Sequence, residues 1–183
     1  MYPENGTSPV DLTCFDAPEG VLDVVYNPAR TALILQAEAL HIPHASGLSM
    51  LVAQAKKACE YFTDTKIPDT EIDRIERLLS HQMQNIVLIG MPGCGKSTVG
   101  KLLAAKTGRA LIDLDAEIVK HAGMPIPDIF AKFGEAHFRD LETKVTKEVC
   151  ATGGKIIACG GGTVTREENM RRLARNGVLV YLT

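Results

Sequence analysis

The residues best suited to chemistry in this 183-residue sequence form one continuous stretch at positions 90–98, Gly-Met-Pro-Gly-Cys-Gly-Lys-Ser-Thr. The spacing is G-x-x-x-x-G-K-[ST], in which glycines allow successive backbone N–H groups to face one anion at a helix N-terminus. Lys96 would add a positive charge near the β- and γ-phosphates of a nucleotide, and the Ser97 hydroxyl would reach a hydrated Mg²⁺ ion. An ordinary glycine-rich turn explains the glycines but not the Gly-Lys-Ser-Thr ending. The stretch therefore predicts a nucleotide phosphate site, formed by Gly93, Cys94, Gly95, Lys96, Ser97 and Thr98.

Two further clusters follow apolar runs later in the chain. Residues 109–115 end in Asp113-Leu114-Asp115, and the two-residue period of a strand would place both carboxylates on one side. There they could hold a hydrated Mg²⁺ ion and a substrate hydroxyl, or Asp115 could simply cap a helix that starts at Ala116. Residues 155–159 run into three glycines, 160–162, which would let a ligand approach the backbone closely or would form only a flexible turn.

Arg139 lies beside an apolar helical stripe, one turn before Glu142. A guanidinium near a helix start can bind a carboxylate substrate through two parallel hydrogen bonds. The alternative is an exposed i,i+3 pair with Glu142, which would contribute only about 0.3 kcal/mol.

Four apolar runs, at 86–89, 109–115, 155–159 and 177–182, are expected to form the strands that position these groups. A helix after the glycine-rich stretch should end at Gly108, and a last one should lie near 167–174. Between them, a short helix with Phe130 should precede a longer one that opens at Gly134-Glu135. This alternation predicts an α/β fold with a parallel sheet and flanking helices, of the type found in P-loop kinases.

The front of the chain has a different pattern. Residues 1–20 have no sustained period and predict a loop or poorly ordered arm. A strand at 21–26, a helix at 31–40, an extended piece at 42–45 and a helix from 46 or 47 to 62 predict part of a doubly wound α/β unit. Pro68 and Asp69 then open an amphipathic helix, so we expect segment 68–84 to connect two parts, 1–67 and 85–183.

The composition of the chain favours a soluble globular protein over several other classes. The chain is 45% apolar and 23% charged with a net charge of −2, which is typical of a soluble globular protein and does not suggest nucleic-acid binding. No apolar run reaches the roughly 20 residues of a membrane helix, and the N-terminus lacks a leader pattern, so we expect a cytoplasmic protein. Five cysteines without C-x-x-C spacing predict reduced thiols and no zinc site.

The order of motifs over about residues 85–183 resembles shikimate kinase. The residues that carry the resemblance are 90–98, Asp113-Leu114-Asp115, Ile129-Phe130, Gly134-Glu135, Phe138-Arg139, Glu142 and Gly160-Gly161-Gly162. The resemblance implies ATP-dependent phosphorylation of the shikimate 3-hydroxyl, with Mg²⁺ as cofactor. It assigns catalysis to Lys96 and Asp115, Mg²⁺ binding to Ser97 and Asp113, and shikimate binding to Asp115, Arg139, Gly161, Phe130 and Phe138. The lid of that family, with its arginine, would follow residue 182, so we expect a missing segment or a partner chain to supply it.

Residues 20–63 resemble the C-terminal end of shikimate dehydrogenase. The resemblance rests on residues 23–28, Thr31 and residues 47–55. It implies that Tyr26 and Gln54 correspond to side chains that contact shikimate, and that Gly47 and Met50 lie beside a nicotinamide. The catalytic Lys and Asp of that family and its dinucleotide loop have no counterpart here, so we expect no dehydrogenase activity. From spacing alone, Tyr26 is an aromatic residue at a strand end and Gln54 is a polar residue on a helix.

The interpretation that unites these features is a fused shikimate-pathway protein, with a dehydrogenase-like tail joined to the front part of a P-loop kinase. Two alternatives remain open. The chain could be a non-catalytic scaffold, or it could be a P-loop kinase for another small metabolite, in which case Arg139 and the glycine triplet would have no assigned ligand.

Overall fold

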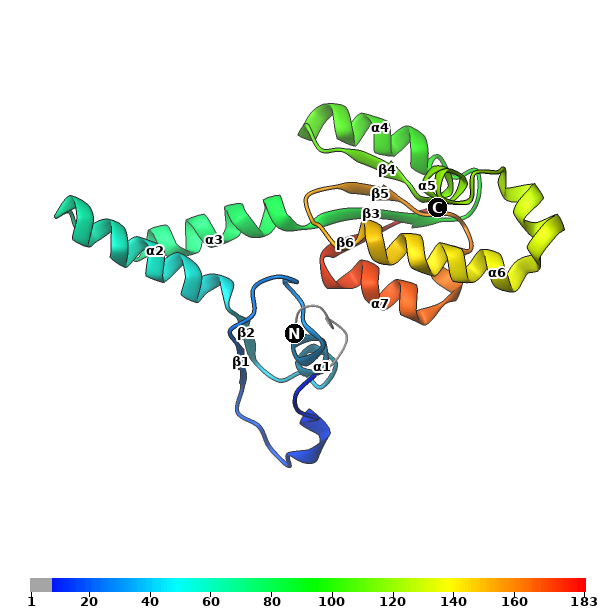
Figure 1. Ribbon diagram of the computed structural model, residues 1–183. Coiled ribbons are helices and arrows are strands. Elements are labelled where there is room, and N and C mark those ends of the chain that lie inside the picture. Colours follow the sequence, from blue (N-terminus) through cyan, green and yellow to red (C-terminus); the bar gives the residue numbers. More distant parts are fainter. Residues whose placement is uncertain (1–7) are drawn as a thin grey trace. The chain divides into compact units, whose positions relative to one another are not determined.

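The computed structural model describes residues 8–183, and the chain divides into two compact units, Met1–Gln82 and Met83–Thr183 (Figure 1). The first seven residues of the loop expected at 1–20 lie outside the described part. Each unit has a hydrophobic core of its own. No helix within residues 8–183 is long and apolar enough to span a bilayer, and all five cysteines are unpaired thiols.

The first unit is built around a short parallel strand pair. Its elements are η1 (Leu12–Cys14), β1 (Val21–Asp23), α1 (Ala32–Ala39), β2 (His44–Ser46), α2 (Leu48–Thr63) and α3 (Thr70–Met83). β1 and β2 pair in parallel from Val21↔His44 to Asp23↔Ser46, and α1 lies between them in the sequence. The Thr31 hydroxyl begins α1 by accepting a hydrogen bond from the N–H of Ile34, at 3.2 Å.

The strand expected at 21–26 ends three residues early, at Asp23. The Asp23 carboxylate accepts hydrogen bonds from the N–H of Val25 at 2.9 Å and from the Thr31 hydroxyl at 2.5 Å. An aspartate that bonds to the backbone two residues ahead turns the chain instead of extending it. The β-branched residues after Asp23 therefore did not decide where the strand ends.

The amphipathic helix expected in segment 68–84 is present as α3, and side-chain hydrogen bonds link it to α2. The Ser49 hydroxyl donates to Glu76 at 2.6 Å, and the Lys56 ammonium donates to Asp69, just before α3, at 2.7 Å. The apolar stripe of α3 is only partly covered, since α3 has no buried residue.

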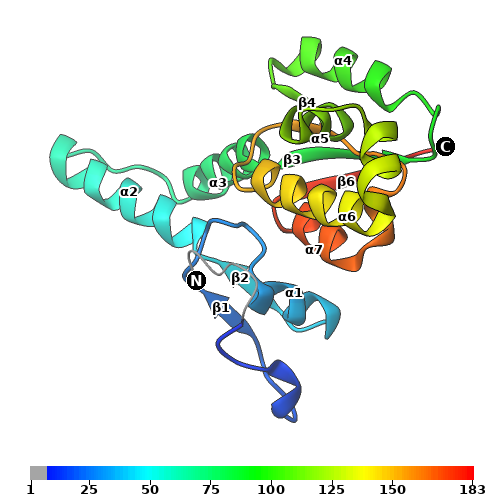
Figure 2. The same cartoon turned by 45° about the vertical axis from the view of Figure 1, so that its right-hand side comes forward.

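The second unit contains a four-stranded parallel sheet with the order β4-β5-β3-β6 (Figures 1 and 2). Its strands are β3 (Asn85–Gly90), β4 (Leu111–Asp113), β5 (Ile156–Ala158) and β6 (Gly177–Leu182). Its helices are α4 (Lys96–Thr107), α5 (Leu114–Ala122), α6 (Ile126–Val149), η2 (Thr163–Thr165) and α7 (Glu167–Arg175). The expected α/β fold with a parallel sheet is thereby confirmed.

Both faces of this sheet are covered, which explains why its strands are apolar without alternation. Leu88 of β3 faces Gly100 of α4, where a methyl group would meet the Leu88 and Leu111 side chains. On the opposite face, Val87 and Ile157 pack in one core with residues of α5, α6 and α7. All parallel strands end at the same edge, so the loops after β3, β4 and β5 lie together there.

Two details differ from the sequence expectation or refine it. The strand expected at 109–115 ends at Asp113, and Asp115 lies in the first turn of α5. The two helices expected around Gly134 are present as two helical segments of α6, which meet at a kink where Gly134 has the non-helical φ 80° and ψ 175°. Glycine adopts that conformation without the penalty of a side chain, so the kink lies where the sequence predicted a boundary.

Candidate active site

The loop between β3 and α4 has the geometry of an anion cradle. Gly93 and Gly95 have φ of 82° and 88°, in the left-handed region, and the space where their side chains would point holds no atom within 4 Å. Gly90 has φ of 148°, and a side chain there would overlap the Leu182 carbonyl of β6. The loop leads directly into the N-terminus of α4, so its open concave side and the helix dipole both suit a phosphate group.

Lys96, the first residue of α4, lies folded across this loop. Its ammonium donates hydrogen bonds to the carbonyls of Gly90 at 2.8 Å and Met91 at 2.7 Å. The Cys94 sulfur lies 3.6 Å from the same ammonium. The loop itself therefore fixes the position of the Lys96 ammonium.

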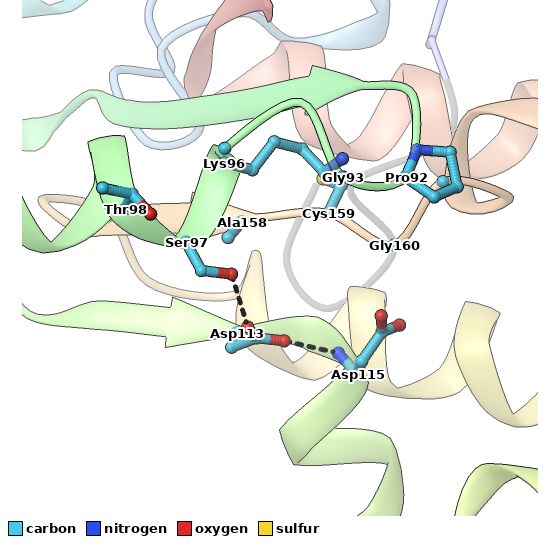
Figure 3. Close-up of a pocket in the computed structure, with 12 residues that line it drawn as sticks. Pro92, Gly93, Lys96, Ser97, Thr98, Asp113, Asp115, Ala158, Cys159 and Gly160 are labelled. Carbon is cyan, nitrogen blue, oxygen red and sulfur yellow. Dashed lines mark hydrogen bonds between the residues drawn. The ribbon is translucent and has the colours of Figure 1, made fainter.

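Asp113, the last residue of β4, connects the end of that strand to the start of α4 (Figure 3). One of its carboxylate oxygens caps α5 by accepting from the N–H groups of Asp115 at 3.1 Å and Ala116 at 3.3 Å. The other accepts from the Ser97 hydroxyl at 3.3 Å. The cap of this helix is thus Asp113, so the alternative in which Asp115 is the cap is wrong.

Asp115 leaves the strand register but its carboxylate still faces the same cavity. The residue as a whole is exposed, yet the carboxylate lies against Gly160, where protein atoms replace part of its water. This loss of hydration raises the pKa of Asp115, and the charges of Asp113 and Glu142 raise it further, while Lys96 and Arg139 oppose the rise. The group is therefore protonated more readily than an ordinary aspartate.

The glycine triplet at the end of β5 touches three different functional groups. A Cβ atom at Gly160 would lie 2.5 Å from an Asp115 carboxylate oxygen, and one at Gly161 would lie 2.8 Å from the Pro92 ring of the phosphate loop. A Cβ atom at Gly162 would overlap the Arg139 guanidinium. The absence of side chains therefore lets this turn lie directly against the carboxylate, the loop and the arginine.

The Arg139 side chain is bound to a buried carboxylate. Its Nη1 donates to Glu142 at 2.9 Å, and Glu142 is only 1% exposed. Its Nη2 reaches the exposed Glu135 at 3.4 Å, and its guanidinium lies 5.3 Å from the Phe138 ring centroid. The hydrogen bond to Glu142 raises the pKa of Arg139, which keeps the guanidinium charged. The expected i,i+3 pair is present, but it is not the exposed surface pair considered in the sequence analysis.

The phosphate loop, the two aspartates and part of the glycine turn border one cavity of ≈ 390 Å³ at the carboxyl edge of the sheet. Its lining is Pro92, Gly93, Gly95, Lys96, Ser97, Thr98, Asp113, Asp115, Ala158, Cys159, Gly160 and Gly161. Burial raises the pKa of the Cys159 thiol to about 12, so this group is neutral at pH 7 and a poor nucleophile. Ser97 and Asp113 together offer a hydroxyl and a carboxylate oxygen, a donor set that suits Mg²⁺ with remaining waters or phosphate oxygens. No group of three or more His, Cys, Asp or Glu side chains within residues 8–183 forms a metal cage.

The structure brings most of the predicted site residues to this cavity and places four beside it. Cys94, Phe130, Phe138 and Arg139 are not part of the lining. The Phe130 and Phe138 rings stack with centroids 4.5 Å apart, next to Arg139, which in turn lies against Gly162. Sequence reasoning missed Pro92, Ala158, Cys159 and Thr163. The proline lies within the motif and could have been found there, whereas the hydroxyl of Thr163 gave no local signal.

The family model for shikimate kinase matches residues 92–183. The chain belongs to the shikimate kinase family. Its second unit is therefore the family's P-loop α/β domain, and the motifs singled out in the sequence lie at the carboxyl edge of that fold.

Individual relatives agree with the family match. The chain is 50% identical over 100 residues to the shikimate kinase of Thermodesulfovibrio yellowstonii, covering 55% of this chain and 58% of the relative. It is 45% identical over 100 residues to that of Persephonella marina, covering 55% and 61%. A shikimate kinase from Acinetobacter baumannii, solved in complex with shikimate, matches with a TM-score of 0.55 and 41% identity, covering 57% of this chain and 59% of that structure. The chain spans less than two thirds of the length of each of these family members.

Proposed function

We propose that residues 83–183 bind ATP and Mg²⁺ and transfer the γ-phosphoryl group to the 3-hydroxyl of shikimate. One observation carries the proposal: a single cavity joins the phosphate loop to Asp113, Asp115 and the glycine turn, and Arg139 lies against that turn. Phosphoryl transfer depends on holding the donor and acceptor in line and on neutralising the charge of the moving group. This cavity contains groups suited to both tasks.

On the nucleotide side, backbone N–H groups of 93–98 and the α4 N-terminus would bind the phosphates. Lys96 would exchange its bonds to the Gly90 and Met91 carbonyls for phosphate oxygens. The Ser97 hydroxyl and Asp113 would hold Mg²⁺, directly or through water, and this ion supplies positive charge that offsets charge on the transferring phosphoryl group. Asp113 would keep its cap on α5, since its other oxygen remains bound to backbone N–H groups.

On the acceptor side, Asp115 would orient the attacking hydroxyl and accept its proton, which needs an ionised carboxylate. Arg139 would bind the substrate carboxylate through the guanidinium edge that Glu142 leaves free. Phe130 and Phe138 would cover an apolar face of the ring, and the backbone at Gly161 would border the substrate. These roles follow from the resemblance together with the contacts of the glycine turn.

The test is ADP release with ATP and Mg²⁺, measured with and without shikimate. We expect release that depends on shikimate, and a much weaker response to its methyl ester, because the ester removes the charge that Arg139 would bind. Comparable release with the acid and the ester would contradict the role of Arg139. No shikimate-dependent release, and no shikimate binding by calorimetry, would instead favour the scaffold alternative.

A P-loop kinase for another small metabolite remains the second candidate. It is less favoured because the Arg139–Glu142 pair places a charged guanidinium beside the cavity with only a weak contact, at 3.4 Å, to an exposed carboxylate on its outer edge. An uncharged acceptor would give the outer edge of the Arg139 guanidinium no carboxylate to bind. ADP release with neutral polyols but not with shikimate would support this candidate.

For the first unit we propose a dehydrogenase-like segment without dehydrogenase chemistry, joined by the 68–84 helix to the kinase domain in a protein of the cytoplasm. The parallel β1–β2 pair with α1 between its strands supports this, because it is one βαβ element of a doubly wound unit. We also propose that the lid of the kinase, and a dehydrogenase domain, are supplied by groups outside residues 8–183. Incubation with NADP and shikimate should produce no NADPH above a blank, and a measurable rate would contradict the proposal.

A further inference from the structure

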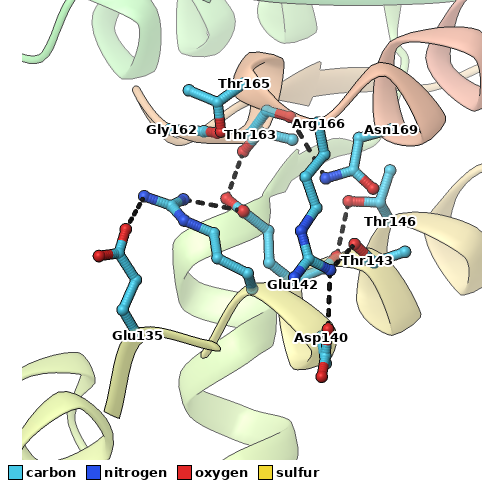
Figure 4. A network of polar contacts seen from close by, with 11 residues as sticks. Glu135, Asp140, Glu142, Thr143, Thr146, Gly162, Thr163, Thr165, Arg166 and Asn169 are labelled. Atoms are coloured by element: carbon cyan, nitrogen blue, oxygen red, sulfur yellow. Dashed lines mark hydrogen bonds and ion pairs between the residues drawn. The ribbon is translucent and has the colours of Figure 1, made fainter. Parts of the chain in front are cut away.

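Glu142 is the centre of a buried polar cluster between α6 and the η2–α7 segment (Figure 4). Its two carboxylate oxygens have different partners. Oε2 accepts from Arg139 Nη1 at 2.9 Å, and Oε1 accepts from the Thr163 hydroxyl at 2.8 Å. The Thr163 side chain comes from a segment 21 residues further along the chain.

Thr163 is itself held in place from both sides. Its N–H donates to the Gly160 carbonyl at 3.2 Å, and its own carbonyl accepts from the Asn169 side-chain amide at 3.2 Å. Thr163 and Asn169 are both fully buried. The hydroxyl that Thr163 presents to Glu142 therefore starts from a backbone fixed by the glycine turn on one side and by α7 on the other.

The contacts form a closed circuit. Arg139 binds Glu142, Glu142 binds Thr163, Thr163 follows Gly162 in the chain, and Gly162 lies directly against the Arg139 guanidinium. A carboxylate without its own anchor would be free to rotate. With Oε1 held by Thr163, Glu142 offers Arg139 only one oxygen, so the guanidinium keeps its other donors.

We infer that Thr163 is a positioning residue for the carboxylate-binding arginine and that it acts through Glu142. This inference rests on the proposed binding of the substrate carboxylate by Arg139. Without the Thr163 hydroxyl, Glu142 Oε1 would be a buried anionic oxygen with no partner, which is costly. Rotation of Glu142 to bind Arg139 with both oxygens would relieve that cost, and it would occupy the donors that the substrate needs.

The chain contains a matched control for this effect. Thr146 is also fully buried, and its hydroxyl also bonds to Glu142, but to the main-chain carbonyl at 2.8 Å. Thr146→Val and Thr163→Val both remove a buried hydroxyl bound to the same residue and replace it with a methyl group. Only Thr163→Val releases the carboxylate. A purely structural role of these hydroxyls predicts equal effects on ligand binding, whereas positioning predicts unequal ones.

The experiment measures shikimate and Mg·ADP affinity by calorimetry in the complete chain and in four variants: Thr163→Val, Thr163→Ala, Thr163→Ser and Thr146→Val. Loss of one hydrogen bond to a charged group should weaken shikimate binding about tenfold in Thr163→Val and Thr163→Ala. Mg·ADP binding should stay unchanged in both. Thr163→Ser keeps the hydroxyl and should restore shikimate binding, and Thr146→Val should bind shikimate like the original chain while losing thermal stability. The alanine variant provides the answer if the valine variant does not fold.

A second readout needs no substrate. The NMR signals of the Arg139 guanidinium in the free protein should change in Thr163→Val and stay in place in Thr146→Val, because only the first releases Glu142. Unchanged shikimate affinity in Thr163→Val, equal weakening in Thr146→Val, or unchanged Arg139 signals would each overturn the inference. Failure of the original chain to bind shikimate would instead count against the proposed acceptor, and the Arg139 signals would still decide the role of Thr163.

Discussion

The two ends of the proposed site, a nucleotide end at the phosphate loop and an acceptor end around Arg139, are built in different ways. The nucleotide end is mainly backbone: glycines with left-handed φ and a helix N-terminus lie within the nine residues 90–98, and only the Lys96 and Ser97 side chains are added. The acceptor end is mainly side chain, since Arg139 depends on Glu142 and Glu142 depends on Thr163. The difference teaches that a local motif can specify one half of a site, whereas tertiary packing must assemble the other.

The two ends should therefore respond differently to substitution. At the nucleotide end, each charged group would act directly on its proposed ligand, so its removal should leave the rest of the loop intact. At the acceptor end, the side chains are joined by hydrogen bonds in a buried cluster, so a substitution at one position should also alter the positions of the others.

The largest effect is expected for Lys96→Ala. Lys96 carries the only charge inside the loop motif, and the alanine variant should lower the rate of ADP release about 10²–10³-fold and weaken ATP binding. The hydrogen-bond partners of the lysine, the Gly90 and Met91 carbonyls and the Cys94 sulfur, all belong to the loop, so shikimate affinity should remain near that of the original chain. Rates and calorimetric affinities measured on the same preparation check both statements. A parallel loss of shikimate affinity would show that the two ends are not separate.

Arg139→Lys should give the next largest effect, at the other end. A lysine keeps a positive charge for the buried Glu142, which protects the fold, but it loses the planar fork that can bind two carboxylates at once. Shikimate affinity should fall about 10- to 100-fold, with Mg·ADP affinity unchanged. Arg139→Ala would leave Glu142 buried without a cation and should also lower the melting temperature. Retention of shikimate affinity in the lysine variant would remove Arg139 from the acceptor site.

The same difference explains which features could be predicted from the sequence. The phosphate loop could be predicted because Gly93, Gly95 and Lys96 act within a few residues of one another. The strands could be predicted from continuous apolar runs, because both faces of the sheet are covered, and the helices could be predicted from their apolar periodicity. The roles of the two aspartates were harder to predict, because the helix starts two residues earlier than expected, at Leu114, and Asp113 is its cap.

Arg139 could be predicted as a binding residue, because an arginine near a helix start and beside an apolar stripe is suited to a carboxylate substrate. Its environment could not be predicted, because the burial of Glu142 depends on a segment 21 residues away that folds over it. Thr163 gave no signal for the same reason: a threonine after three glycines is unremarkable until its partner is known. Contacts of this kind are set by packing and not by local spacing.

Asp115 lines the cavity between the two ends, and its ionisation should set how the rate of ADP release depends on pH. Because the pKa of Asp115 is raised, its ionised form is lost at a pH above the ordinary value of 3.8. ADP release should therefore begin to fall, as acid is added, earlier than an unperturbed aspartate would allow. A profile with no inflection above pH 3.8 would exclude Asp115 as the group that accepts the hydroxyl proton.

The raised pKa of Asp115 also affects the stability of the fold, and here substitution should be favourable although it lowers activity. A carboxyl group with a raised pKa in the folded state makes the folded protein bind protons more tightly than the unfolded chain, so its ionisation costs stability at neutral pH. Asp115→Asn should remove that cost and raise the melting temperature at pH 7, while ADP release falls. Well below pH 3.8 the Asp115 side chain is protonated in both the folded and the unfolded state, so the melting temperatures of the two proteins should converge.

The smallest effect is expected at Glu135, which should compete with the substrate. Arg139 Nη2 reaches Glu135 at 3.4 Å, and 71% of the Glu135 side chain is exposed, so this pair is weak compared with the buried Glu142 pair. A substrate carboxylate that takes the same donors must first displace Glu135. An exposed pair of this kind contributes about 0.2–1 kcal/mol, so Glu135→Gln should tighten shikimate binding up to about fivefold.

The control for this prediction is Asp140→Asn on the same helix. Asp140 is also exposed and paired, but with Arg166 at 2.8 Å, so its substitution removes the same charge without touching Arg139. Long-range electrostatics would make both variants tighten binding alike, and more so at low salt. Direct competition predicts tightening in Glu135→Gln alone, because only that carboxylate occupies donors of the shared guanidinium. Weaker binding in Glu135→Gln would mean that Glu135 helps to orient Arg139, and the acceptor end would then depend on an exposed side chain as well as on its buried ones.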